Sequence, residues 1–394
     1  MSSLANRAIQ ISGSSSPSTS IDHIEYAHLV VKNLVNGLLQ RGATMVTIVG
    51  SEPRAGTDGL GTPSIVFYWS VLEAVMDFSR SSASRNTGHP LARIVCSEKS
   101  EREIPVARSD LWKQLVHSRS VALDFIPPGW NSNSIKRRAQ ERRGDALVVI
   151  GGGAGAEEST HLYVSHGKPV LPLDIPLGSS CDDGTGGAPE MLRWARTHPR
   201  AFFPNISEEI AAGLSLLKYG RYTNSPKNFA DAILDFLSAV VRPQVFCARL
   251  ADEDTKHFAD VDTFFRSVVR PALSEMGFEP IEIIGKSPIR SSLIDIEIFK
   301  QMNRSPYSVV DLTGLRPSCC IELGYLLGSC KRTIVTAARG TKLPFDVKTL
   351  PCTFWDPKDP AKSMTRFHKD WAAMIDRPYL SEINESIVGI RDTV

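Results

Sequence analysis

Two carboxylates stand in the stretch DLTGLRPSCCIELGYLLG: Asp311 opens it and Glu322 lies beyond its middle. Asp311 closes the apolar run SVVD, which predicts a buried strand, and Glu322 follows in a predicted helix of apolar and small residues. Ligands of open α/β sheets bind beyond the carboxyl ends of the strands, so we expect Asp311 at the binding edge. We expect Glu322 in the first turn of its helix, where the helix dipole favours the carboxylate while apolar neighbours reduce its solvation.

Such a carboxylate is a candidate nucleophile or electrostatic stabiliser. Cleavage of an N-glycosidic bond needs one, because the anomeric carbon of the sugar gains oxocarbenium character that a carboxylate beneath it stabilises or captures covalently. A second acid can protonate or hold the departing base. The alternative is that Glu322 only caps its helix, a role worth about 0.5–2 kcal/mol.

A second candidate site is the glycine-rich run VVIGGGAGAEES at 148–159. Its glycines are Gly151, Gly152, Gly153 and Gly155. They would let backbone amides approach a ligand closely, and a helix that begins near Ala156 would point its N-terminus at the same place, which predicts an anion site. The run lacks the Gly-Lys-Ser/Thr of a P-loop and does not fit the spacing of a dinucleotide-binding fingerprint. The alternative is a turn whose glycines serve only tight packing of strand against helix.

The elements that must position these residues alternate between strand and helix in both halves of the chain. Apolar runs such as TMVTIVG, LARIVC and DALVVIG in the first half, and PQVFCARL, YSVVDLTG and RTIVTAA in the second, predict strands separated by helices. This pattern requires parallel sheets with helices on both faces. The predicted fold class is α/β, with two doubly wound, Rossmann-like domains at 1–205 and 243–394 and a helical connection at 206–242.

Composition narrows the classes of function. A chain of 394 residues is long enough for two domains. With 45 basic and 43 acidic residues its formal net charge is +2, so nucleic acid is not an expected partner. The seven cysteines contain no CxxC pair, and no Cys/His cluster has the spacing of metal ligands, so we expect reduced thiols and no metal. Without a secretory signal or an apolar run of about eighteen residues, we expect a cytoplasmic protein that does not span a membrane.

The glycine-rich run, its flanking strand and helix, and the following HGKPVLPLD resemble the SLOG superfamily, which includes phosphoribohydrolases, DprA/Smf proteins and nucleotide sensors of bacterial defence. IQISGSSSPS, a helix and RGATMVTIVG are similar to the first βαβ unit of that family. The resemblance covers about residues 6–205 and implies a nucleotide-binding domain. The ligand-binding residues that it implies are Gly13, Ser14, Gly151, Gly152, Gly153, Gly155, Glu157 and Glu158.

Two substitutions separate this chain from the phosphoribohydrolases of that superfamily. Those enzymes carry PGGxGTxxE, whereas this chain has Ile150 in place of the proline and Ala156 in place of the threonine. Their arginine-bearing motif is also missing in recognisable form, and the arginines at 137–143 lie either near the turn or on a solvated helix face. The resemblance therefore implies nucleotide sensing rather than catalysis by this half.

The stretch SPYSVVDLTGLRPSCCIELGYLLGSCKRTIV resembles the nucleoside 2-deoxyribosyltransferase family and its deoxynucleotide N-hydrolase relatives, over about residues 243–375. The resemblance implies that Glu322, the glutamate of the ELG motif, is catalytic. Asp295 in SLIDIEIF is the best match to an aspartate that contacts the sugar hydroxyls, and Asp311 matches the acidic position that closes the central strand. Both are expected to be catalytic residues together with Glu322. Tyr325, the tyrosine of ELGY, and Gly314 are candidate substrate-binding residues.

Other positions of this half are more ambiguous. Arg249 and Asp252 follow the first strand and would meet a phosphate or base, or be only loop charges. Arg316-Pro317-Ser318 replaces the common Asn-Pro-Asn of the family, and two cysteines stand just before the glutamate. We expect the cysteines to be packing residues, although a helix N-terminus can activate a thiol such as that of Cys320. KLPFDVKTLPCTFWDP is similar to the closing segment of TIR-like and deoxyribosyltransferase-like domains that cleave nucleotides in defence systems.

Three functions agree with these features. The first is a switch in which the SLOG-like half binds a nucleotide-type signal and the other half cleaves an N-glycosidic bond of NAD or another nucleotide, as an effector of bacterial antiphage defence. The second is a metabolic nucleoside or nucleotide deoxyribosyltransferase or N-hydrolase with a regulatory domain. The third is a non-enzymatic module whose output is assembly. The fusion of two nucleotide-type domains favours the first. NAD or a nucleotide is expected as substrate or ligand, with no separate cofactor, and both resemblances imply a homo-oligomer.

Overall fold

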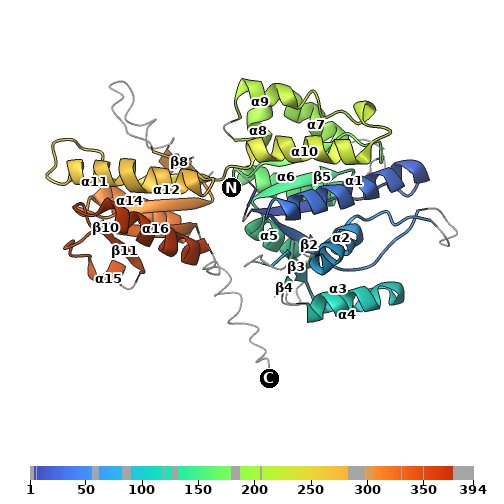
Figure 1. The fold of residues 1–394 in the computed structure, drawn as a ribbon, viewed down its shortest axis with the longest axis horizontal. Coiled ribbons are helices and arrows are strands. Elements are labelled where there is room, and N and C mark those ends of the chain that lie inside the picture. The colour runs from blue at the N-terminus through green and yellow to red at the C-terminus, as the bar shows by residue number, and fades with distance from the viewer. Residues whose placement is uncertain are drawn as a thin grey trace. The chain divides into compact units, whose positions relative to one another are not determined.

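The computed structural model describes residues 4–5, 7–55, 62–81, 90–118, 120–126, 132–178, 187–204, 206–282, 298–299, 301–303, 305–329, 331–348 and 350–375. The chain forms two compact units, Met1–Val241 and Arg242–Val394. Each unit contains one sheet of parallel strands with helices packed around it (Figure 1). The predicted α/β class with two doubly wound sheets is confirmed.

The sheet of the first unit has the strand order β4-β3-β2-β1-β5-β6. Its strands are β1 (Ala8–Ser12), β2 (Thr44–Ile48), β3 (Ala92–Cys96), β4 (Val121–Phe125), β5 (Ala146–Ile150) and β6 (Val170–Leu173). β1 pairs in parallel with β2 on one side and with β5 on the other, so the direction of winding reverses between β1 and β5. At such a switch point the loops after the two strands diverge and leave room for a ligand.

Helices cover both faces of this sheet. They are α1 (Ile21–Gln40), α2 (Tyr68–Arg80), α3 (Glu98–Arg102), α4 (Ser109–His117), α5 (Ser132–Arg143), α6 (Ala154–Ser165), α7 (Gly187–Thr197), α8 (Pro199–Phe202), α9 (Glu208–Gly213) and α10 (Pro226–Val240), with the short turns η2 (Val106–Arg108) and η3 (Tyr219–Arg221). Alternate side chains of β5 pack into the two layers of helices on opposite faces of the sheet. Val148 and Ile150 belong to the core that contains the apolar faces of α1 and α2, whereas Leu147 and Val149 pack with Tyr163 of α6.

The residues expected to form a helical connection, 206–242, lie almost wholly within the first unit. α10 runs alongside α1 (Figure 1), and its apolar residues Phe229 and Ile233 are fully buried in the same core as α1. Gly37 of α1 permits this approach, because a Cβ at that position would overlap the side chain of Leu234. The apolar stripe of α10 is therefore used to complete the first unit.

The sheet of the second unit has the order β11-β10-β9-β7-β8, again with every pair parallel. Its strands are β7 (Gln244–Ala248), β8 (Glu279–Ile281), β9 (Tyr307–Asp311), β10 (Arg332–Ala338) and β11 (Cys352–Trp355). β7 pairs with β8 on one side and β9 on the other, so the switch point of this unit lies between β7 and β9.

Helices also cover both faces of the second sheet. They are α11 (Phe258–Phe264), the π-helical turn η4 (Phe265–Val269), α12 (Arg270–Glu275), α14 (Pro317–Gly328), α15 (Phe345–Lys348) and α16 (Pro360–Ile375). Val245 and Cys247 of β7 pack with residues of α11 and α16, while Phe246 packs with Leu323 and Leu326 of α14. None of the helices in the described part of the chain has the length and apolarity that a membrane crossing requires.

Candidate active site and ligand site

Glu322 lies in the second turn of α14, not in the first as expected. Pro317 occupies the first helical position, and Arg316 is the residue before it. Proline is favoured there because its missing N–H has no partner in a first turn. The helix dipole acts mainly within the first turn, so it gives Glu322 less support than expected. Burial alone accounts for the perturbation of this carboxyl, raising its pKa to about 7.

The Glu322 carboxylate is half-buried and forms no hydrogen bond or ion pair with another residue that the structure describes. It is flanked by Ile321, whose surface is 65% exposed, and by Leu323 in the core. A desolvated carboxylate without a partner retains its full capacity to stabilise an external positive charge. Glu322 therefore has the properties expected of the catalytic carboxylate.

Asp311 ends β9 as predicted, but its carboxylate is enclosed. Oδ2 accepts hydrogen bonds from Thr336 Oγ1 at 2.7 Å and from Trp355 Nε1 at 2.8 Å, while Oδ1 accepts from the Thr313 amide at 3.0 Å. Only 1% of the residue is exposed, and burial raises its pKa against the effect of these donors. Both oxygens face protein donors, so the geometry favours a positioning role over the catalytic role that the sequence suggested. Asp295, the third expected catalytic residue, lies outside the described residues.

The loop after β9 is held in one conformation by several contacts. The Ala338 amide donates to Thr313 Oγ1 at 2.8 Å, and the Leu312 amide donates to the Thr336 carbonyl, so the loop is fixed to β10. Gly314 and Leu315 then adopt left-handed conformations with φ of 78° and 51°. Leu315 is the one non-glycine residue of the described chain with positive φ, and backbone strain of this kind is often held at ligand sites. The conformation of this loop therefore fixes the direction in which α14 begins.

His257, a residue that sequence reasoning did not select, lies beside Gly314. Its Cδ2 atom would be 3.4 Å from a Cβ placed on Gly314. His257 immediately precedes α11 at the end of the loop after β7, so the two loops of the switch point approach each other here. No local pattern of the sequence indicates this neighbour, because the contact depends on two strands meeting in the sheet.

Arg249 follows β7 as expected, but its donors are used within the protein. Its side chain is 3% exposed, with Nε 2.6 Å from Glu282 Oε2 and Nη2 3.0 Å from Asp262 Oδ1. The guanidinium also lies 5.4 Å from the centre of the Phe265 ring. Arg249 thus joins β7, α11 and the end of β8, and it does not have the free donors that a substrate-binding arginine needs.

Tyr325 lies one turn beyond Glu322 on α14. Its hydroxyl donates to Asn303 Oδ1 at 3.0 Å, and its ring packs edge-to-face against Phe299 at 4.8 Å. These contacts hold Tyr325 against Phe299 and Asn303. Of the expected substrate-binding residues, only Gly314 therefore lies directly in a loop of the switch point without a competing side-chain role.

In the first unit, the loop after β1 and the glycine-rich turn after β5 meet at the switch point. The Gly152 amide donates to the Ser14 carbonyl at 2.6 Å. A Cβ on Gly13 would overlap the carbonyl oxygen of Ile150, and one on Gly151 would overlap that of Ser14. The structure thus brings Gly13, Ser14, Gly151 and Gly152 together, and the contact between the two backbones requires glycine at positions 13 and 151.

Gly13→Ala is expected to destabilise the first unit by about 3 kcal/mol or more, because Gly13 has φ of 141° and a Cβ has no space beside Ile150. Hydrogen exchange of peptides from β1 and β5 measures this loss. Gly220→Ala is the matched control, since a Cβ there meets no atom within 4 Å. Equal exchange protection in the two variants would contradict the requirement for glycine at position 13.

The rest of the glycine-rich turn leads into a helix N-terminus. Helix α6 begins at Ala154, two residues earlier than expected, and Gly153 precedes it without a side-chain cap. The amides of Ala154 and Gly155 donate to no carbonyl in the part of the chain that the structure describes. The first glycines of the turn therefore serve close packing, while the amides of Ala154 and Gly155 have no acceptor among the described residues, as the predicted anion site requires.

The two glutamates that follow differ in their surroundings. Glu157 is exposed. Glu158 is held by α5, because the Ser134 hydroxyl and the Arg137 guanidinium lower the pKa of its carboxyl. The Arg137 guanidinium also lies against Gly155, so it borders the first turn of α6. The basic helix α5 is consequently more than a solvated face. The Glu158 carboxylate is paired with this helix and does not point at the turn as a free ligand-binding group.

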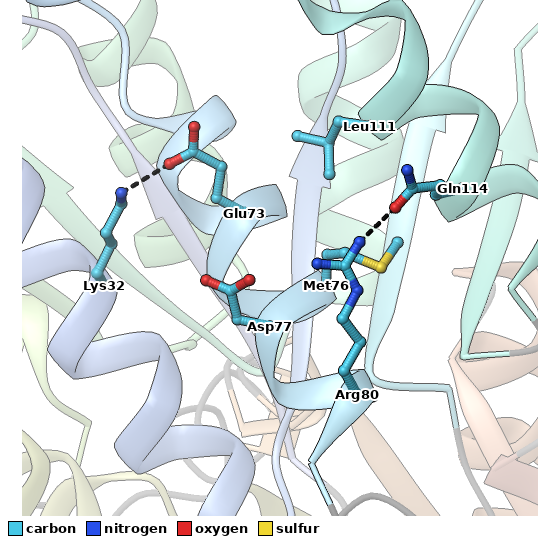
Figure 2. A pocket seen from close by; sticks show the side chains of 7 residues that line it. All are labelled: Lys32, Glu73, Met76, Asp77, Arg80, Leu111 and Gln114. Carbon is cyan, nitrogen blue, oxygen red and sulfur yellow. Dashed lines mark hydrogen bonds and ion pairs between the residues drawn. The ribbon is translucent and has the colours of Figure 1, made fainter.

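A polar pocket of about 450 Å³ lies elsewhere in the first unit, between α1, α2 and α4 (Figure 2). Figure 2 shows Lys32 directed at Glu73, with 2.7 Å between Nζ and Oε2, and Arg80 directed at Gln114, to which it donates a hydrogen bond. The pocket is built by side chains of helices rather than by loops after strands. Because both of these cations already have partners, we assign no ligand to it.

One family model matches a part of the chain that lies within the first unit. The family described as ATP nucleosidase Cap17-like, N-terminal, matches residues 4–214, which lie within the first unit. Two curated relatives, both named ATP nucleosidase Cap17, come from Escherichia coli strain KTE188 and from Escherichia coli. Each is 25% identical over 240 residues, which are 61% of this chain and 46% of the relative. The chain thus spans about half the length of the curated relatives that it matches.

One solved structure aligns over most of the chain, the crystal structure of an α,α-trehalose 6-phosphate synthase from Burkholderia multivorans. It covers 98% of this chain and 92% of its own, at 11% identity and a TM-score of 0.22. That score is too low to support any argument about fold or function.

Proposed function

Because the chain belongs to the ATP nucleosidase Cap17-like N-terminal family, we propose that its first unit binds a nucleotide-type signal and that its second unit then cleaves the N-glycosidic bond of a nucleotide. The family match supports a nucleotide as the ligand of the first unit, since the family is named after an ATP nucleosidase. It covers the unit in which the glycine-rich turn and the N-terminus of α6 meet the loop after β1. The setting that we propose is bacterial antiphage defence, in which loss of the nucleotide is toxic to the cell.

The second unit lies outside the family match, so the proposed chemistry rests on its own residues. The observation that carries it is Glu322, a half-buried carboxyl without a described partner whose pKa is raised to about 7 by burial. Such a carboxylate beside an anomeric carbon gains strength as an electrostatic partner, because the low local dielectric does not screen it.

The reaction would proceed as follows. A Glu322 oxygen bonds to the anomeric carbon while the carbon–nitrogen bond breaks, and the electron pair leaves with the base, which takes up a proton from solvent. Water then attacks the anomeric carbon, loses a proton and releases the carboxylate. Asp311 is unsuited to the acid role, because both of its oxygens accept hydrogen bonds from buried donors. Its contribution is to hold the loop that precedes α14.

The test is release of free base from ATP, NAD, dATP and deoxyadenosine by the purified full chain, with and without a panel of linear and cyclic nucleotides as signals. We expect base release from a nucleotide in the wild type and none in Glu322→Gln. Glu275→Gln is the control, since that side chain is 63% exposed at the end of α12. Base release by Glu322→Gln at the wild-type rate would refute the proposal. Base exchange between deoxynucleosides would favour the metabolic alternative, and ligand-driven assembly without turnover the non-enzymatic one.

The pH dependence of kcat/KM follows from the raised pKa of Glu322. A nucleophile must be ionised, and a carboxyl with a pKa of about 7 is mostly protonated at pH 6 and mostly ionised at pH 8. We therefore expect kcat/KM to rise about tenfold between pH 6 and pH 8 and then to level off. A profile measured by base release that falls across this range would instead assign Glu322 the role of a general acid.

A further inference from the structure

We propose that Arg316 binds a phosphate group of the substrate and so makes the second unit select nucleotides over nucleosides. The inference rests on the proposed function, because it concerns the substrate of the same site. It begins from an ion pair between the two loops of the switch point. Arg316 ends the loop after β9, and its Nη2 lies 3.1 Å from Oδ2 of Asp252 in the loop after β7. The side chain therefore bridges the two loops of the switch point.

The backbone places Arg316 there with little freedom. The left-handed residues Gly314 and Leu315 come immediately before it, and the Leu315 amide closes a turn by donating to the Leu312 carbonyl at 3.0 Å. Pro317 follows and begins α14. Because proline fixes its own φ and restricts the residue before it, Arg316 is held extended with ψ of 131°. The backbone that carries the Arg316 guanidinium is therefore fixed in one conformation.

The ion pair that Arg316 makes is easily exchanged for a ligand. Its side chain is 41% exposed and that of Asp252 is 39% exposed, and pairs so open to water add little stability. Asp252 also keeps a partner when Arg316 leaves, since its Oδ1 accepts from the Asp254 amide at 3.2 Å. Arg249 differs, because its removal from Glu282 and Asp262 would leave buried carboxylates unpaired. Of these two arginines, only Arg316 can change partner at low cost.

The chemistry of the guanidinium identifies the new partner. Its planar donors match two oxygens of a phosphate, and such bonds between charged groups are shorter and stronger than neutral ones. Arg316 is the residue that precedes α14, and Glu322 lies in the second turn of the same helix. The proposal places one ribose 5′-phosphate between them, with Glu322 toward the anomeric carbon and Arg316 toward the phosphate. A nucleoside would leave Arg316 paired with Asp252.

The kinetic test compares adenosine, AMP and ATP as substrates. Arg316→Gln is expected to raise KM for AMP and ATP about 10–100-fold with little change in kcat, and to leave adenosine unaffected. Arg316→Lys keeps the charge without the paired donors and should restore part of the loss. Asp252→Asn frees the guanidinium and should lower KM for both nucleotides. Arg339→Gln is the control, because Arg339 pairs with Asp356 at the ends of β10 and β11, away from the switch point.

A binding measurement makes the test independent of turnover. AMP and adenosine are titrated calorimetrically into Glu322→Gln and into the double variant Glu322→Gln/Arg316→Gln. We expect the second change to weaken AMP binding about 10–100-fold and adenosine binding not at all. Equal AMP affinity in the two proteins, or an equal loss for AMP and adenosine, overturns the assignment of Arg316. Turnover that persists in Glu322→Gln overturns the proposed reaction instead, so the two failures are distinguishable.

Discussion

Glu322→Gln is expected to abolish base release, by about 10³-fold or more, and to stabilise the second unit at neutral and alkaline pH. The two effects have one cause, the burial that raises the pKa of this carboxyl to about 7 from an ordinary value of 4.5. Between these pH values the folded chain keeps a proton that the unfolded chain has lost. The free energy of unfolding therefore falls as pH rises through this window, and it stays lowered above pH 7.

Glutamine does not ionise, so the variant escapes this loss. After allowance for partial exposure, we expect a gain of about 1–3 kcal/mol at pH 8 that disappears near pH 4.5. Hydrogen exchange of peptides from β7 and β9 follows the second unit alone, which matters because a chain of two units need not unfold in one step. Glu322→Asp keeps the charge and should lose activity without this gain. A destabilised Glu322→Gln at pH 8 would mean that the carboxylate has a stabilising partner.

The strands were predictable because they depend on short apolar runs. YSVVD is apolar enough to fix β9 locally, and this alone places Asp311 at the carboxyl edge of the sheet. The position of Glu322 in the second turn could also have been predicted from the sequence, since proline is typical of the first helical position and Pro317 precedes Glu322 by five residues. The prediction of a first-turn glutamate was wrong because this proline signal was not used.

The roles of the edge residues were not predictable, because they depend on contacts between distant segments. The register of the sheet sets Thr336 opposite Asp311, and Trp355 comes from the strand beyond it. The sequence suggests that Arg249 is a loop charge that faces a ligand, yet its guanidinium forms an ion pair with Glu282, which follows β8. In both cases a charged residue at the carboxyl edge of the sheet stabilises the fold, and only its hydrogen-bond and ion-pair partners show this.

Asp311→Ala is expected to destabilise the second unit by about 3–5 kcal/mol, the largest loss of stability that we predict for this unit. The carboxylate accepts from three donors that belong to the loop after β9, to β10 and to β11. Alanine would leave the Trp355 indole N–H and the Thr313 amide buried without an acceptor, and each such group costs about 1–3 kcal/mol. Hydrogen exchange in β9, β10 and β11 measures the loss, with Thr336→Val as a milder control that removes one donor.

Asp311→Asn separates a positioning role from a catalytic one. The amide keeps the size of the side chain but presents an NH₂ group to at least one of the three donors, so we expect a smaller loss of about 1–2 kcal/mol. If Asp311 acts through the loop, activity should fall with stability and recover in part when a nucleotide at high concentration stabilises the fold. A stable Asp311→Asn protein without activity would contradict this view. The Thr336 hydroxyl and the Asp311 carboxylate take part in the same hydrogen bond. The positioning role therefore also requires that the double variant Thr336→Val/Asp311→Asn loses less free energy of unfolding than the sum of the losses in the two single variants.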